Sequence, residues 1–170
     1  MRQSVTAPDT ESDWMDQERA TRLQYNPDLT IVTPSPWGRL TGMRSALLRR
    51  VVDAVHSRGR VPQVCLYALA FGGCVPQASF DAAAAYADRQ SWRVKAGSAF
   101  TDPAGAGALE SRQGWARVRQ QIRGGHATGV VVITTDVITA DPVEYERELD
   151  WFDRNSGFIA VAVPEVAGRR

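Results

Sequence analysis

The sequence is poor in the residues that build disulfide frameworks, metal sites and membrane spans. Its 170 residues include two cysteines and two histidines, which argues against a disulfide scaffold and gives no convincing set of metal ligands. No run approaches the roughly 18 apolar residues that cross a bilayer. The polar amino terminus also lacks the apolar core of a secretion signal. We therefore expect a cytoplasmic protein with no metal, no cofactor and no membrane partner.

An excess of either charge is also missing. Twenty basic and nineteen acidic residues give a formal net charge of +1. This balance provides no overall electrostatic footprint for a polyanion, so any contact with nucleic acid must use a local patch. Hydrophobic residues at 44% and charged residues at 23% are typical of a globular protein. The length suits one domain with a proper core.

Three segments follow one another along the chain. Residues 1–41 contain several prolines and many polar residues, and predict an irregular extension. Residues 42–60 carry apolar side chains at helical spacing and predict an amphipathic helix. Residues 61–166 alternate strand and helix patterns. They predict an α/β fold of three layers, with a mostly parallel central sheet of about four strands flanked by helices.

Local signals locate the elements of this last segment. Apolar and β-branched runs predict strands at 64–70, 92–99, 128–134 and 158–163. Helical spacing, or an alanine-rich composition without breakers, predicts helices at 79–90, 112–123 and 141–156. The last of these begins with Asp141 as N-cap, Pro142 at N1 and Glu144 at N3. The glycine- and alanine-rich loop at 101–111 is expected to be mobile.

Four pieces of this segment, read in order, resemble the catalytic domain of the serine recombinases (resolvases and invertases). The pieces are VCLYALAF at 64–71, AAAAYADRQSW at 82–92, FTD with a glycine-rich loop and SRQGW at 100–115, and TGVVVITTDVITADPVEYERELDWFDRNSGFIAVAVPE at 128–165. Their common order carries more weight than any one match. The resemblance implies a resolvase-like three-layer domain related to site-specific DNA recombination.

The resemblance also implies a site, and this chain departs from it. In the family a serine hydroxyl attacks a DNA phosphodiester and forms a covalent phosphoserine link, while several arginines stabilise the transferring phosphate. By alignment on Tyr67, the serine position and three arginine positions have lost their chemistry. The degenerate positions are Phe71 for the serine and Leu69, Val137 and Ala140 for the arginines. We therefore predict no catalytic residues and an inactive site.

Two residues keep the polar character of the family site, Arg112 and Asp136. Arg112 is also the first of three arginines at helical spacing, with Arg119 and Arg123. This stripe is either a solvated helix face or a surface for nucleic-acid contact. Asp136 is either an acceptor within its loop or a remnant of the site.

Three functions are compatible with these observations. The first is a degenerate recombinase-like domain that binds DNA or a full-length serine recombinase, as a regulator or as a remnant of a mobile element, and that is compatible with a homo-oligomer. The second is a flavodoxin-like or nucleotide-binding α/β domain. The third is an active DNA strand-cleaving recombinase with a misaligned nucleophile, in which Ser79, Ser98 or Ser111 approaches Arg112. Because little sequence follows the last strand, we expect no carboxyl-terminal DNA-binding domain.

Overall fold

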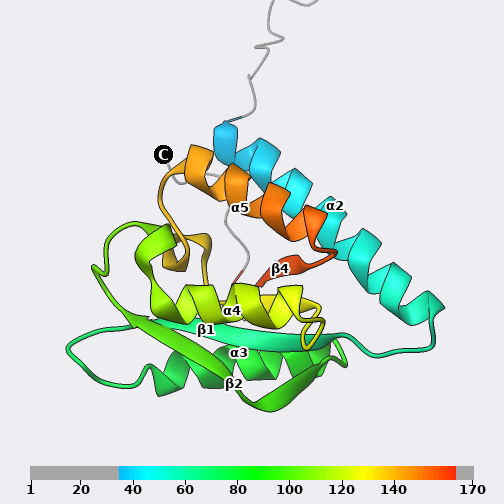
Figure 1. The fold of residues 1–170 in the computed structure, drawn as a ribbon, viewed down its shortest axis with the longest axis horizontal. Helices are drawn as coiled ribbons and strands as arrows, with labels where there is room; N and C mark the ends of the chain where they lie inside the picture. Colours follow the sequence, from blue (N-terminus) through cyan, green and yellow to red (C-terminus); the bar gives the residue numbers. More distant parts are fainter. Residues whose placement is uncertain (1–34, 164–170) are drawn as a thin grey trace, which may run out of the picture. The chain divides into compact units, whose positions relative to one another are not determined.

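A four-stranded parallel sheet forms the centre of the computed structural model, which describes residues 35–163. The sheet has the order β2-β1-β3-β4 (Figure 1). The strands are β1 (Gln63–Ala70), β2 (Arg93–Pro103), β3 (Gly129–Val132) and β4 (Phe158–Val161). All three pairings are parallel. Every residue of β3 and β4 is buried, as their continuous apolar sequences predict for strands covered on both faces, although β4 lies at the edge of the sheet.

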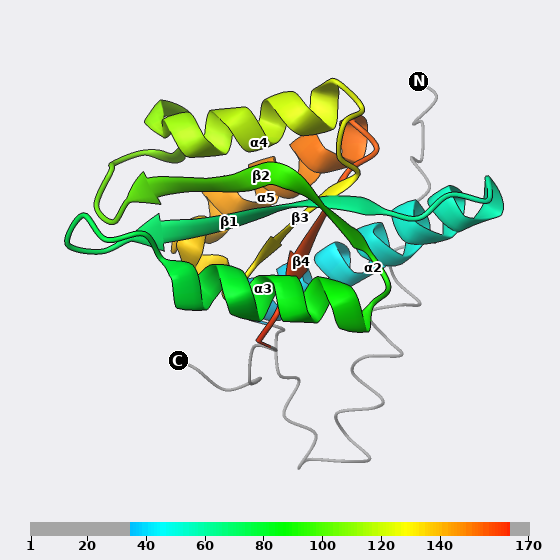
Figure 2. The same cartoon turned by 90° about the horizontal axis from the view of Figure 1, so that it is seen from below.

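Helices cover both faces of this sheet. The helices are α2 (Pro36–Ser57), α3 (Gln77–Arg89), α4 (Gln113–Arg123) and α5 (Pro142–Arg154), with short 3-10 turns η1 (Leu109–Ser111) and η2 (Thr135–Val137). Figure 2 shows α3 on one face, with α4 and α5 on the other. From β1 the chain crosses to β2 on one side of it in the sheet, and from β2 it crosses back past β1 to β3. Because these two crossovers run in opposite directions across the sheet and both are right-handed, α3 and α4 lie on opposite faces. The predicted three-layer α/β fold is confirmed.

Aromatic side chains fill the layer between the sheet and α4 and α5. Trp115 of α4 is fully buried, with its ring centroid 5.0 Å from that of Tyr67 in β1 and 5.9 Å from that of Phe152 in α5. Packing of this kind contributes dispersion energy in addition to the removal of apolar area from water. The layer therefore fixes α4 relative to the strand that carries Tyr67.

The first described helix begins earlier than the sequence indicated. Residues 1–41 were expected to be irregular, yet α2 begins at Pro36, and the Ser35 hydroxyl accepts a hydrogen bond from the Gly38 amide. Leu40 and Leu47 from this helix join the same core as the sheet. The expected amphipathic helix is therefore six residues longer at its start than 42–60 and is part of the folded unit. The rest of the predicted extension, residues 1–34, and the end of the 61–166 segment lie outside the described residues.

Candidate functional site

The carboxyl ends of β1 and β2 meet the start of α4, and three polar side chains converge there. Tyr67 points from β1, Asp102 from β2, and Arg112 immediately precedes α4. The Tyr67 hydroxyl donates to Asp102 Oδ2 over 3.0 Å. Tyr67 is fully buried and Asp102 is 5% exposed. The contact therefore lies inside the domain rather than on its surface.

Asp102 holds the start of α4. Its Oδ1 accepts from the Gly114 amide over 2.8 Å, and its Oδ2 accepts from the Trp115 amide over 2.9 Å. These are two of the amides that a helix start leaves without a partner in the helix. Arg112, the N-cap residue, makes no side-chain cap, so Asp102 provides the cap from a neighbouring strand. A carboxylate at this position also interacts favourably with the helix dipole.

Gly114 allows this close approach. A Cβ at this position would lie 2.5 Å from the Thr101 carbonyl oxygen and 2.7 Å from Asp102 Oδ2. Only a residue without a side chain lets α4 begin directly against β2. The glycine of the SRQGW motif is therefore explained by packing.

Arg112 is half-buried, and its guanidinium donates to backbone oxygens through Nη1 and Nε. Its Nη1 donates to the carbonyls of Val137 and Ile138 over 3.0 and 2.8 Å, and its Nε donates to Gly107 over 3.3 Å. Burial raises the pKa of Tyr67 above its ordinary value; Arg112 opposes this rise, and the charge of Asp102 adds to it. Tyr67 is thus a neutral hydrogen-bond donor at physiological pH, not a phenolate nucleophile.

A pocket of about 490 Å³ is lined in part by this cluster. Its lining includes Asp102, Ser111, Arg112 and Arg117, with backbone from β2. The lining contains no histidine that could activate a hydroxyl. Within residues 35–163, no three side chains of the metal-binding types come together, and no helix is long and apolar enough to span a membrane.

The degenerate positions surround the same end of the sheet. Leu69 is half-buried at the end of β1, and Phe71 is 72% exposed in the loop that follows. Val137 is half-buried in η2, and Ala140 is exposed before α5. Asp136 is exposed beside Val137, whose carbonyl binds Arg112. The structure therefore brings Arg112 to the η2 loop through backbone contacts, while the Asp136 side chain forms no hydrogen bond with it.

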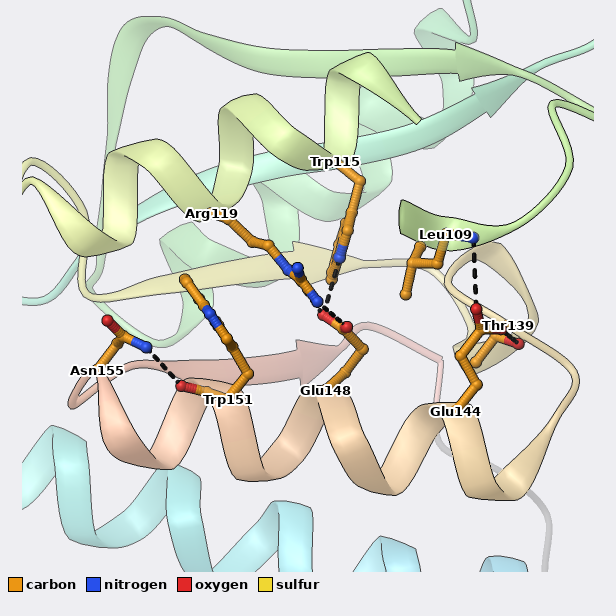
Figure 3. Close-up of polar contacts among 8 residues, drawn as sticks. All are labelled: Leu109, Trp115, Arg119, Thr139, Glu144, Glu148, Trp151 and Asn155. Atoms are coloured by element: carbon orange, nitrogen blue, oxygen red, sulfur yellow. Dashed lines mark hydrogen bonds and ion pairs between the residues drawn. The ribbon is translucent and has the colours of Figure 1, made fainter. Parts of the chain in front are cut away.

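The arginine stripe of α4 divides into three different environments. Arg119 forms an ion pair with Glu148 of α5, whose carboxylate also accepts from Trp115 Nε1 over 2.9 Å (Figure 3). Its guanidinium carbon lies 5.1 Å from the centre of the Trp151 ring. Arg123 is exposed above the same ring, at 5.7 Å. The stripe is therefore not a uniform solvated face. Nucleic-acid contact by Arg119 and Arg123 stays a prediction, and the ion pair with Glu148 reduces the charge that Arg119 offers to such a partner.

A second carboxylate of α5 holds the loop between β2 and α4. Figure 3 shows Glu144 reaching both Leu109 and Thr139. Its Oε1 accepts from the Leu109 amide over 3.3 Å, and its Oε2 accepts from the Thr139 hydroxyl. The Leu109 side chain is buried. The second half of the loop that was expected to be mobile is therefore anchored to α5.

Sequence reasoning missed the two most buried polar groups of this cluster. Neither Tyr67 nor Asp102 was expected to be a site residue, although both lie within recognised pieces of the sequence, VCLYALAF and FTD. The available signal was a carboxylate two residues after the aromatic Phe100 of the strand and ahead of a glycine-containing helix start. Of the serines considered as replacement nucleophiles, Ser111 is next to Arg112, Ser98 is buried in β2, and Ser79 lies on α3, across the sheet.

Comparison with known proteins gives results at the level of structure only. No family model matches the sequence, and no curated protein does. Seven chains of solved structures match the fold. One is the C-terminal catalytic domain of ISC1926 TnpA, an IS607-like serine recombinase, with 18% identity, a TM-score of 0.48, and coverage of 61% of this chain and 71% of that one. Another is the N-terminal catalytic domain of TP901-1 integrase, with 21% identity, a TM-score of 0.48, and coverage of 59% and 76%.

The first of these is named as a serine recombinase, the family that the sequence pieces resemble. At this level of identity the likeness concerns the fold and assigns no role to any residue of this chain. The site is therefore interpreted from its own contacts.

Proposed function

We propose that this chain is a serine recombinase-like domain that acts by binding and does not cut DNA. The observation that carries the proposal is Phe71, a residue that is 72% exposed directly after β1, where the family resemblance expects the attacking serine. A phenyl ring has no atom that can attack phosphorus. The hydroxyl nearest in sequence to Arg112, that of Ser111, donates to the Ala108 carbonyl over 2.7 Å.

The charge at this end of the sheet supports the same conclusion. The loops that follow β1, β2 and β3, residues 71–76, 104–112 and 133–141, contain Arg112 as their only basic residue. Phosphoryl transfer develops negative charge on the transferring phosphate and needs several preorganised cations. Arg112 already donates to three carbonyl oxygens. Arg112 used in this way, with Arg117 as the other arginine in the pocket lining, is a poor substitute for a set of catalytic cations.

Binding is the activity that such a domain retains. The partner that we propose is DNA, or a full-length serine recombinase whose assembly the domain joins. Either partner makes the chain a regulator of recombination or a remnant of a mobile element.

Covalent trapping on DNA tests the absence of cleavage. The protein is incubated with end-labelled duplex DNA and run on a denaturing gel, beside Phe71→Ser and Ser111→Ala variants. We expect no protein–DNA adduct from any of the three, because Phe71→Ser restores a hydroxyl without its arginines. An adduct from the native chain that disappears in Ser111→Ala would overturn the proposal and identify a displaced nucleophile.

The strand order favours a second candidate, a flavodoxin-like binding domain. The order β2-β1-β3-β4 reproduces the first four strands of that fold, in which the ligand occupies the crevice beyond the ends of β1 and β3. The loop after β1 also contains Gly72 and Gly73 with positive φ. A rise in melting temperature with flavin mononucleotide, at concentrations far above its Kd, would support this candidate. An unchanged melting temperature is expected if the chain is recombinase-like.

A further inference from the structure

A row of exposed arginines lies at the end of the sheet opposite to the candidate site. Four loops lead into the strands at that end, residues 58–62, 90–92, 124–128 and 155–157, and Figure 2 shows them gathered on the side where the strands begin. Six arginines in or directly beside these loops form what we call the amino-end rim. They are Arg58, Arg60, Arg89, Arg93, Arg123 and Arg154, and all are exposed.

The charge of the rim is largely uncompensated. The four loops contain no acidic residue, and within residues 35–163 none of the six arginines forms an ion pair. Of the two acidic residues next to the rim, Asp88 and Asp153, the second is paired with Arg50 of α2. The loops at the other end of the sheet contain three acidic residues and one basic residue. Positive charge is therefore concentrated at the end of the sheet where the strands begin, away from the candidate site.

A structural role explains four of the six arginines. Arg89, Arg123 and Arg154 are the last residues of α3, α4 and α5, and Arg58 is the C-cap of α2, where a cation stabilises the helix dipole. Arg60 and Arg93 have no such role. Arg60 belongs to the loop before β1, and Arg93 begins β2.

The chemistry of the rim fits phosphate groups. Arginine presents a planar fork of donors that matches phosphate oxygens. Four adjacent strands at about 4.8 Å each span about 14 Å, and this length of duplex DNA carries about four phosphates on each strand. In the loops of the rim, Val61 is the only large hydrophobic residue that is notably exposed, so an apolar anchor for a protein hot spot or a bilayer is lacking.

We infer that the amino-end rim binds the phosphate backbone of duplex DNA. This inference rests on the proposed binding function and names its surface, which is separate from the degenerate site. Contacts to phosphates alone position a protein on DNA without selecting a sequence. The rim therefore holds DNA with little sequence preference and with a strong dependence on salt.

Fluorescence anisotropy with a labelled duplex of arbitrary sequence, titrated with the full chain at several salt concentrations, tests this inference. Four phosphate contacts predict that log K falls with log salt with a slope of about −3.6, which is a loss of about 150-fold between 50 and 200 mM. Arg60→Gln with Arg93→Gln reduces the slope to about −1.8 and weakens binding about 60-fold at 100 mM. The matched control is Arg49→Gln with Arg147→Gln, which removes the same charge from exposed helix positions.

The control pair is expected to bind within about threefold of the native chain, and equal melting temperatures show that both pairs fold. Equal losses in the two pairs would overturn the inference, because net charge alone would then explain binding. It would also be overturned by no binding at 50 mM salt, or by a preference for single-stranded RNA over duplex DNA. These outcomes leave the absence of cleavage untouched, whereas a covalent adduct would overturn the proposed function and not the rim.

Discussion

The clearest energetic consequence of the structure is the effect of replacing Asp102 with asparagine. Three donors converge on the two oxygens of this buried carboxylate: the Tyr67 hydroxyl and the amides of Gly114 and Trp115. Asparagine keeps one oxygen and places an NH₂ group in the other position. If the NH₂ group takes the place of Oδ2, it faces the Tyr67 hydroxyl and the Trp115 amide. If the side-chain amide is flipped, the NH₂ group takes the place of Oδ1 and faces the Gly114 amide. At least one amide of α4 then faces another donor.

The magnitude follows from the number of bonds that change. Losing one hydrogen bond to a charged group costs about 1.5 kcal/mol, and leaving a buried amide without a partner costs about the same again. Loss of the negative charge at the helix start adds up to about 1 kcal/mol. Asp102→Asn should therefore lower the free energy of unfolding by about 3 kcal/mol. For a chain of this length, this is a fall in melting temperature of about 6–12 °C.

Thermal and urea unfolding, followed by circular dichroism, measure this effect. The matched control is Tyr67→Phe, which removes one donor, leaves both α4 amides bound, and should cost about 1.5 kcal/mol. If Asp102→Asn costs less than Tyr67→Phe, the capping of α4 from β2 is refuted. An equal dependence of the unfolding free energy on urea concentration in all three proteins would show that the native fold is kept.

Three further measurements test other parts of the structure. Gly114→Ala should cost about 2 kcal/mol because its Cβ would meet a β2 carbonyl oxygen at 2.5 Å; an unchanged melting temperature would contradict this packing. Burial raises the pKa of the Cys65 thiol to about 12, whereas Cys74 is exposed. A thiol reagent at pH 8 should therefore label one cysteine per chain in the native protein and two in denaturant. Rapid labelling of both cysteines in the native protein would be inconsistent with the buried strand. The hydrogen bond from Arg39 lowers the pKa of Glu146, so the pair stabilises the fold above the unfolded pKa of glutamate, about 4.3, and this contribution is lost as pH falls through the lower folded value. The difference in melting temperature between native protein and Glu146→Gln should shrink between pH 6 and pH 3, and a constant difference would count against the pair.

The sequence predicted the elements whose signals are local. The Asp141-Pro142 start of α5 was predicted from the cap residue and the following proline, and the Asp141 carboxylate does accept from the Val143 amide over 2.9 Å. Ser35-Pro36 carries the same signal at the start of α2. It was missed because neighbouring prolines and polar residues were interpreted as an irregular segment.

Contacts between distant segments could not be predicted in this way. Arg119 looked like part of an exposed stripe because its partner, Glu148, is 29 residues further along the chain. The loop before α4 looked mobile because its composition does not reveal that Glu144 binds the Leu109 amide. Asp102 belonged to a recognised motif, yet its role depends on how closely Gly114 lets α4 approach β2. These partners are brought together by tertiary packing, which spacing along the sequence does not encode.

The central claim is that this recombinase-like domain binds without forming a covalent link to DNA. Its most direct test is the intact mass of the full chain after incubation with duplex DNA, denaturation and nuclease digestion. The account predicts only the unmodified protein of 18.6 kDa, under conditions in which anisotropy shows that the DNA is bound. A species heavier by a nucleotide, mapped to a serine, would contradict it.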